Sequence, residues 1–350
     1  MRVPIDALQS FCVTALRQAG LNETDAESTA QVLVTTDAMG VFTHGTKLLI
    51  GYLTRLHGGG YRAAGRPKIE REGPGWAVVD GDSALGQVGS LFAMQTAIAK
   101  AKKVGIAYVG LRNTGHIGAA GYYASLAARE GLISQVTGND MPSVAAPGSR
   151  GPVLGSNPFA YGVPVPGSDP ILLDIATAAV AGGKVYAAHQ RGETIPGNWI
   201  IDRAGRPTTD GSLYPHNAAL APMAGHKGYG LGLWVEVLSG ILPGGAVTWQ
   251  VGSWMFDEVS KPSLHNAAFI AIDVATVADP VLYKSRINAL IDEIHAAPTA
   301  DGVERVLLPG EREWSLRQEA IQQGILLPED VKAKLRQVAS ENGIVADWLA

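Results

Sequence analysis

The spacing of apolar side chains predicts helices at the start of the 350-residue chain. Between residues 4 and 17, apolar residues recur every three or four positions, the period of a helix with one buried face, and Gly20 follows as a stop signal. Thr24 and Glu27 have the spacing of a capping box, so they predict a second helix that runs to about Met39.

A third helix is expected to begin at His44, and the glycines at 58–60 end it. After residues 309–311 the chain is again expected to be helical to its end. We therefore predict a helical lobe built from residues 1–60 and 311–350.

The region between these helices predicts strands that alternate with helices. Two short strands are expected at 68–72 and 76–80, because Gly73-Pro74-Gly75 between them is a hairpin signal. A helix over about 87–104, a strand at 106–111, a helix from 119 and a strand near 132–137 are expected next. This alternation indicates an α/β layer.

Residues 140–225 are rich in glycine and proline, with short strands such as 171–174, so many backbone groups there could face a ligand. Further on, the pattern predicts a helix at 227–242, a strand at 267–274 and an amphipathic helix at 279–296. The chain is therefore predicted to be α/β, with residues 61–310 as a mixed region that binds cofactor and substrate.

Composition narrows the function classes. With 46% hydrophobic and 17% charged residues the chain is expected to be globular, and its net charge of −4 argues against nucleic-acid binding. Cys12 is the only cysteine, which excludes an internal disulfide, and it is expected in the core. No signal peptide is recognisable, and the apolar stretch 228–245, which contains Glu236, predicts a buried helix rather than a membrane span. We expect a cytoplasmic protein without a membrane partner.

Several common signatures are missing from the sequence. No GxGxxG follows a predicted strand, and residues 181–184 lack the first glycine and the Ser/Thr of a P-loop. There is no HExxH and no GxSxG motif. The eight histidines have no metal-ligand spacing, so a metal-dependent hydrolase is only a third interpretation and no metal is predicted.

His44 and His116 are the residues that most suggest chemistry. Each lies beside a glycine at a point where a helix is expected to begin. Histidine exchanges its proton near neutral pH, so the pair suggests acid–base chemistry on a small molecule. The plainer interpretation is that both are ordinary residues at the start of a helix.

The helix expected after His44 would carry further polar groups on the same face. Leu48, Tyr52 and Arg55 follow His44 at helical spacing, and Lys47 lies one turn from it. If this face lines a pocket, it offers a proton carrier, a phenol and two cations. Alternatively, Leu48 and Tyr52 belong to the core and Arg55 lies outside.

Sequence blocks in a fixed order carry a resemblance to a known family. They are THG at 43–45, GIAYVGLRNTGHIGAAGYYASLAAREGLI at 105–133, LGSNPFAYGVP at 154–164, LLDIAT at 172–177, IPGNWIIDRAGRPTTD at 195–210, GHKGYGLGLWVEVLSGIL at 225–242 and LLPGERE at 307–313. Over nearly its whole length the chain resembles the malate/L-lactate dehydrogenase family, which includes ureidoglycolate and sulfolactate dehydrogenases, diketogulonate reductase and piperideine-2-carboxylate reductase.

The resemblance implies an oxidoreductase that uses NAD or NADP on a small 2-oxo or 2-hydroxy acid, a related oxo compound or a cyclic imine. It also implies a mixed-sheet fold distinct from the Rossmann fold, and a homodimer. His116 and His44 match the family's catalytic histidines, and Tyr52 and Lys47 are assigned to the substrate. The cofactor segments match Asp140, Asp174, Ile175, Ala176, His226, Lys227, Pro309, Gly310 and Glu311.

The chain departs from the family pattern at three positions. Leu48 and Met39 stand where many relatives carry arginine. Either Lys47 compensates as a point charge, or the substrate carboxylate is held elsewhere, or the substrate has no carboxylate there. In some relatives an aspartate lies two residues after the asparagine that corresponds to Asn139, whereas here Asp140 follows Asn139 directly. Asp140 is therefore not expected to orient His116 as that aspartate would. These departures motivate an alternative, a catalytically inactive nucleotide-binding regulatory protein.

Overall fold

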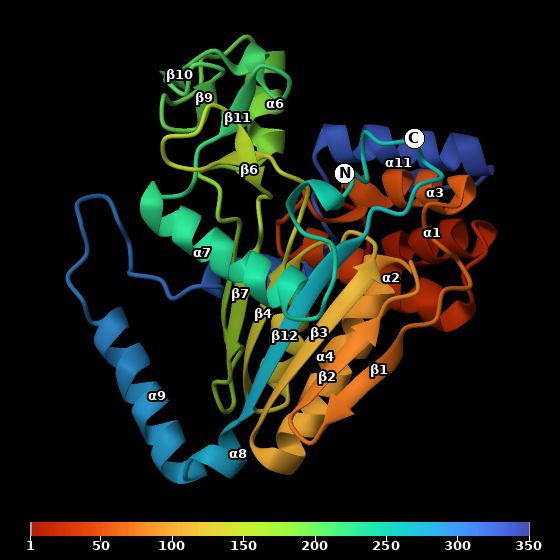
Figure 1. Cartoon of the computed structure of the whole chain (residues 1–350). Helices are drawn as coiled ribbons and strands as arrows, with labels where there is room; N and C mark the ends of the chain where they lie inside the picture. The colour runs from red at the N-terminus through yellow and green to blue at the C-terminus, as the bar shows by residue number, and fades with distance from the viewer. Residues whose placement is uncertain (1, 350) are drawn as a thin grey trace.

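A mixed sheet of seven strands forms the centre of the protein, in the order β1-β2-β3-β12-β4-β7-β8 (Figure 1). The computed structural model describes residues 2–349. The strands are β1 Lys68–Gly73, β2 Trp76–Asp80, β3 Ile106–Thr114, β4 Leu132–Gly138, β7 Phe159–Val163, β8 Ile171–Ile175 and β12 His265–Asp273. Strands β2 and β3 run parallel, and the other neighbours are antiparallel. The predicted mixed α/β class is confirmed.

Helices cover the two faces of this sheet. Helices α4 (Gly86–Val104) and α5 (Ala120–Arg129) pack on one face, where small buried side chains such as Ala93 and Ala97 allow close approach. Helix α7 (His226–Glu236), continued by a π-helical turn over Val237–Ile241, crosses the opposite face (Figure 1). The sequence predicted a buried helix here. This prediction is wrong for part of the helix surface, because Leu233 and Trp234 are exposed.

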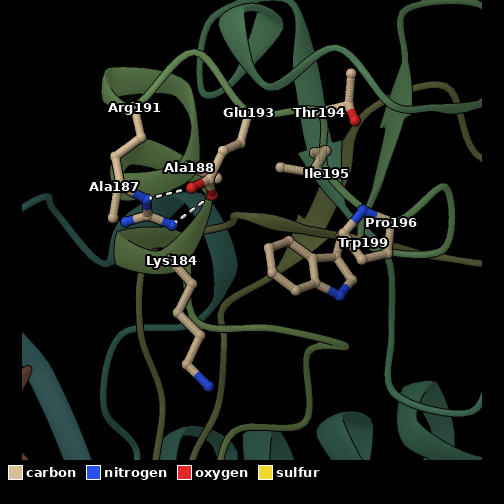
Figure 2. Close-up of a pocket in the computed structure, with 9 residues that line it drawn as sticks. All are labelled: Lys184, Ala187, Ala188, Arg191, Glu193, Thr194, Ile195, Pro196 and Trp199. Atoms are coloured by element: carbon tan, nitrogen blue, oxygen red, sulfur yellow. Dashed lines mark hydrogen bonds and ion pairs between the residues drawn. The ribbon is translucent and has the colours of Figure 1, made fainter.

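A second, smaller sheet contacts α7 through its edge strand β6. Its strands are β5 Val144–Ala145, β6 Pro152–Leu154, β9 Ile200–Asp202, β10 Pro207–Thr208 and β11 Ala218–Leu220, accompanied by α6 (Gly182–Gln190). A hollow of about 300 Å³ between α6 and residues 193–199 is lined by Lys184 and Trp199, and Arg191 forms an ion pair with Glu193 at its edge (Figure 2). The residues lining it include none of the predicted site residues.

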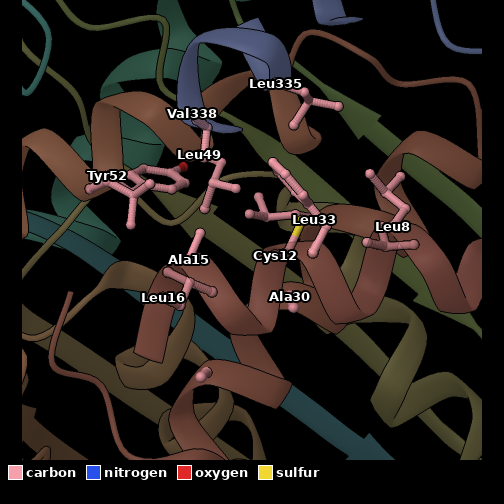
Figure 3. Packing of buried hydrophobic residues seen from close by; sticks show 14 of the residues in the cluster. Leu8, Cys12, Ala15, Leu16, Ala30, Leu33, Leu49, Tyr52, Leu335 and Val338 are labelled. Carbon is pink, nitrogen blue, oxygen red and sulfur yellow. The ribbon is translucent and has the colours of Figure 1, made fainter. Parts of the chain in front are cut away.

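The terminal helices pack together around one hydrophobic cluster. They are α1 Ile5–Gln18, α2 Glu23–Ala38, α3 Leu49–Gly58, α10 Glu311–Gln323 and α11 Glu329–Asn342. Leu8, Leu33 and Leu49 from the first three helices meet Leu335 and Val338 of α11, and all five are fully or almost fully buried (Figure 3). Cys12 lies inside this cluster, as expected from its place on an apolar helix face.

Helices α8 (Val274–Val277) and α9 (Pro280–His295) follow β12 and extend away from the sheet (Figure 1). The region of the chain after residue 310 is not continuously helical, because residues 324–328 separate α10 from α11 and Ile325 pairs with Val3. Within residues 2–349 no helix is both long enough and apolar enough to cross a bilayer.

Two predicted helix starts are wrong. The side chain of Asn22, rather than that of Thr24, caps α2 by accepting a hydrogen bond from the Asp25 amide at 3.0 Å. Asn22 has the extended backbone that a cap needs, whereas Thr24 already lies in the first turn. Helix α3 begins at Leu49 after a short 3-10 turn, so His44 lies in the loop before the helix.

Candidate active site

Three imidazoles from distant parts of the chain meet in one cluster. His44 comes from the loop before α3, His116 from the turn between β3 and α5, and His265 from the first residue of β12. The ring centroids of His44 and His116 are 5.9 Å apart, and those of His116 and His265 are 5.8 Å apart. The structure therefore brings together the two predicted histidines and adds a third that the sequence did not indicate.

His116 is held on several sides. Its Nδ1 is 2.9 Å from the hydroxyl of Tyr52, and its ring stacks on Trp254 with centroids 4.7 Å apart. Its backbone amide donates to the hydroxyl of Tyr61 at 3.1 Å. No hydrogen-bond partner within residues 2–349 engages Nε2 of His116, so this nitrogen is available to a ligand.

Burial keeps both predicted histidines neutral. Burial, together with the neighbouring His265 and His44, lowers the pKa of His116 to about 3, and the charge of Asp140 opposes the change only partly. Burial also lowers the pKa of His44. A neutral imidazole can accept a proton at pH 7. A helix dipole does not contribute to these shifts, because α3 and α5 begin four or more residues after these histidines.

Asp140 pairs with the third histidine. Its Oδ1 lies 3.1 Å from Nε2 of His265, whose Nδ1 is 2.9 Å from the hydroxyl of Ser263. Burial raises the pKa of Asp140, but the hydrogen bond and the charge of His265 outweigh it, so the net pKa is lowered. Asp140 makes no hydrogen bond to His116, in agreement with the expectation from its position in the sequence.

Tyr52 is fully buried, and burial raises the pKa of its phenol above the ordinary value. The sequence assigned Tyr52 to the substrate. In the structure its hydroxyl is hydrogen-bonded to His116, so it fixes the orientation of that ring. Tyr52 also packs against Trp254, with ring centroids 5.1 Å apart.

The two cations predicted near His44 are occupied elsewhere. Lys47 donates from Nζ to Asp330 of α11 at 2.7 Å. Arg55 is neither a free cation of the pocket nor outside the core, because it is 2% exposed and binds backbone carbonyls of residues 253–261. Its long side chain is accommodated because these carbonyls satisfy the guanidinium inside the protein.

Hydrogen bonds connect two of the predicted cofactor segments with neighbouring elements. Asp174, on β8, accepts a hydrogen bond at 2.7 Å from the amide of Gly121, in the first turn of α5. The amide of Leu172 donates to Pro309 at 3.0 Å, and Gly310 has a φ of +91° and no space for a side chain beside Leu172. The first bond places Asp174 beside the first turn of α5, and the second places residues 309–311 beside β8.

The remaining cofactor candidates have different surroundings. His226 and Lys227 are exposed at the first turn of α7, and the nearby Met223 amide donates to the carbonyl of Thr177 at 2.9 Å. Glu311 accepts from the amide of Leu308 and from His295, so its carboxylate ties the loop before α10 together.

Trp254, Tyr61 and His265 surround His116, but the sequence analysis did not identify them. They lie in segments without a helical or strand period that would have indicated a shared site, and His265 precedes by two residues the strand predicted at 267–274. In the described part of the chain, no three His, Cys, Asp or Glu side chains are arranged to hold a metal ion.

Comparisons with known proteins confirm the family resemblance found in the sequence. A family model described as malate/L-lactate dehydrogenase matches residues 3–336. Malate dehydrogenase of Pyrococcus abyssi is 37% identical over 351 residues, which cover 98% of this chain and 96% of that protein. Ureidoglycolate dehydrogenase (NAD(+)) of Escherichia coli O157:H7 is 34% identical over 331 residues, covering 95% and 94%.

A solved structure agrees as well. The crystal structure of malate dehydrogenase from Entamoeba histolytica superposes with a TM-score of 0.92 at 30% identity and covers 99% of both chains. Over nearly its whole length the chain is thus similar in sequence and fold to dehydrogenases. The chain belongs to the malate/L-lactate dehydrogenase family.

Proposed function

We propose that this enzyme uses NAD or NADP to interconvert a small 2-oxo acid and the corresponding 2-hydroxy acid. A related oxo compound or a cyclic imine is the alternative substrate of the same chemistry. The observation that supports this most directly is the pair of neutral imidazoles of His44 and His116, with Nε2 of His116 open to a ligand. The name of one relative includes NAD(+), which supports NAD without excluding NADP.

The residues fit a nicotinamide cofactor held outside a Rossmann motif. Lys227 is exposed at the start of α7, where backbone amides and a cation favour a phosphate. Residues 174–176 and 309–311, with Asp140, would complete the proposed set; the bond from Gly121 to Asp174 and that from Leu172 to Pro309 support a common position of the two segments at β8. When bound, the nicotinamide would accept or supply the hydride.

His116 would move the proton. In oxidation its neutral ring accepts the proton of the substrate hydroxyl as the C–H bond breaks, and in reduction it returns the proton to the oxygen. With Nδ1–H donating to the hydroxyl of Tyr52, Nε2 carries the lone pair and would be the atom that exchanges the proton. His44, whose Nδ1 is 3.0 Å from the hydroxyl of Thr43, would share substrate binding.

Replacing each histidine tests the proposal. His116→Ala and His44→Ala are expected to lower turnover by about two to four orders of magnitude, the usual scale of acid–base catalysis. The measurement is oxidation of NADH and NADPH with a panel of 2-oxo acids and a cyclic imine. His57→Ala, an exposed histidine of α3, is the matched control and should retain activity.

A double variant of His44 and His116 with normal turnover would contradict the assignment. If the unaltered protein binds NADH or NADPH but no oxo compound oxidises the cofactor, the result would instead favour the alternative of a catalytically inactive regulatory protein. The family resemblance also supports a homodimer, which sedimentation equilibrium would detect as the mass of two chains.

A further inference from the structure

The guanidinium of Arg55 has no free donor. Nε donates to one carbonyl and each terminal nitrogen donates to two, at distances between 2.6 and 3.2 Å; the acceptors are Ser253, Trp254, Asp257, Glu258 and Lys261. An arginine has five N–H groups, so all of them are used. Arg55 therefore cannot bind a substrate carboxylate, although it lies on the helix that carries Tyr52.

The segment 253–261 lies directly against α3. A side chain at Gly51 would come within 2.7 Å of the Trp254 ring, and one at Gly58 within 2.5 Å of Val259. At Gly60 an added carbon would approach the Val259 carbonyl to 2.3 Å. The glycines of this helix thus admit the segment, and the charge of Arg55 satisfies carbonyls that would otherwise be buried without partners.

Trp254 is the residue of this segment that faces the site. It is 7% exposed, and its ring stacks on His116 with an interplanar angle of 17°. The neighbouring Met255 and Phe256 point outward and are exposed. One helix therefore holds His116 in two ways, directly through the hydroxyl of Tyr52 and indirectly through Arg55 and Trp254.

We propose that Arg55 is a positioning residue that fixes segment 253–261 so that Trp254 covers one face of His116 and keeps water from it. The proposal rests on the proposed function, in which His116 carries the proton. Lysine would not replace Arg55, because a single ammonium cannot reach carbonyls spread around a planar fork.

The pKa of His116 depends on whether Trp254 covers the ring, so it can be used to test the proposal. The groups that face His116 are His44, His265, Asp140 and the phenol of Tyr52, with Trp254 as the apolar cover. If Trp254 moves away, water reaches the ring and the cost of charging it falls. The pKa of His116 should then rise from about 3 toward the ordinary value for histidine.

The experiment is an NMR titration of isotope-labelled histidine in the ligand-free protein, with the His116 signal assigned from His116→Gln. Arg55→Lys and Trp254→Ala are each expected to raise the pKa of His116 by about one pH unit or more. The double variant should show no more than the larger single effect, because both changes remove the same contact. Arg17→Lys, an exposed arginine of α1, is the control and should titrate as the wild type.

Two results would overturn the proposal: an unchanged His116 titration in folded Arg55→Lys, or fully additive effects in the double variant. If Arg55→Lys does not fold, Trp254→Ala still decides, since an unchanged titration there contradicts the role of the segment. The titration needs no substrate. A protein without activity on any 2-oxo compound would therefore refute the proposed function and leave this test intact.

Discussion

At the scale of single residues, Leu48 stands at a position where the family resemblance leads us to expect arginine. Its side chain is partly buried and packs against the hydrophobic cluster that contains Tyr52 and Trp254. Lys47, the nearest candidate to replace a missing arginine, is paired with Asp330. Position 48 is therefore apolar, and the adjacent cation is already engaged by a carboxylate.

Leu48→Arg should strengthen binding of an acidic substrate. Arginine there would offer a planar pair of donors to a carboxylate, and a charge-assisted bond of this kind is worth about 1.5–3 kcal/mol. We expect the KM for 2-oxo acids to fall by about tenfold or more, since 1.4 kcal/mol corresponds to a factor of ten. Steady-state kinetics on a series of 2-oxo acids measures this, with Leu48→Met as the uncharged control. An unchanged KM in the folded arginine variant would mean that the carboxylate is held elsewhere.

The sequence predicted some of these residues and not others for a physical reason. His44, His116 and Tyr52 lie in motifs whose residue types suggest chemistry by themselves. Helical spacing also placed Arg55 on the face of Tyr52, but whether a cation on that face is free or buried depends on carbonyls about 200 residues away. Trp254 and His265 acquire their meaning only through such long-range packing.

At the scale of elements, the loop before α3 is held by a buried acid of α2. Asp37 is 1% exposed and accepts hydrogen bonds from the backbone amide and the hydroxyl of Thr46. Burial raises the pKa of Asp37 to about 7. A side chain on Gly45 would lie 1.8 Å from Oδ1 of Asp37, so only glycine fits between His44 and Thr46.

Gly45→Ala should therefore displace the loop that carries His44. The added methyl group overlaps a buried carboxylate that cannot move aside, and overpacking of this kind costs about 1–3 kcal/mol. We also expect turnover to fall by about a hundredfold, the effect of a misplaced catalytic group. Urea unfolding and steady-state kinetics measure the two effects. Gly183→Ala on α6, where an added carbon meets nothing within 4 Å, should show neither, and equal behaviour of the two variants would refute the explanation.

Element boundaries were less predictable than the elements themselves. The long strands β3, β4 and β12 and the helices α4 and α9 begin and end within a few residues of their predicted limits. The strands of the smaller sheet have only two or three residues, too few to show a period of two. The cap of α2 was predicted at Thr24 and lies at Asn22, two residues earlier, which is determined by the backbone conformation.

At the scale of the whole molecule, the site is built where the terminal helices meet the central sheet. Tyr52 and His44 come from the N-terminal region, His116 and Asp140 from the middle of the chain, and His265 from a late strand. Helix α11 covers the helices that flank His44 through Leu335 and Val338. The histidines therefore come together only when the entire chain is folded. In the folded protein they are buried, and burial lowers their pKa values.

This burial has a cost that should appear in the stability of the whole protein at low pH. The pKa of His116 is lowered from 6.5 to about 3 by burial and by the neighbouring His265 and His44. Between these pH values the unfolded chain binds a proton that the native protein does not bind. The free energy of unfolding should therefore fall as the pH decreases from about 6.5 toward 3, with no contribution from His116 above that range. At pH 5, about 1.5 pH units below 6.5, the loss due to His116 is at most about 2 kcal/mol. Urea unfolding of the wild type and of His116→Gln at pH 7 and pH 5 measures this loss, and the variant should lose less stability than the wild type on acidification.

The control is His57→Gln, which alters an exposed histidine of α3 and should behave as the wild type. If His116→Gln and the wild type lose the same stability, then His116 is protonated in the native protein at pH 5 and is not the neutral proton acceptor that the mechanism requires.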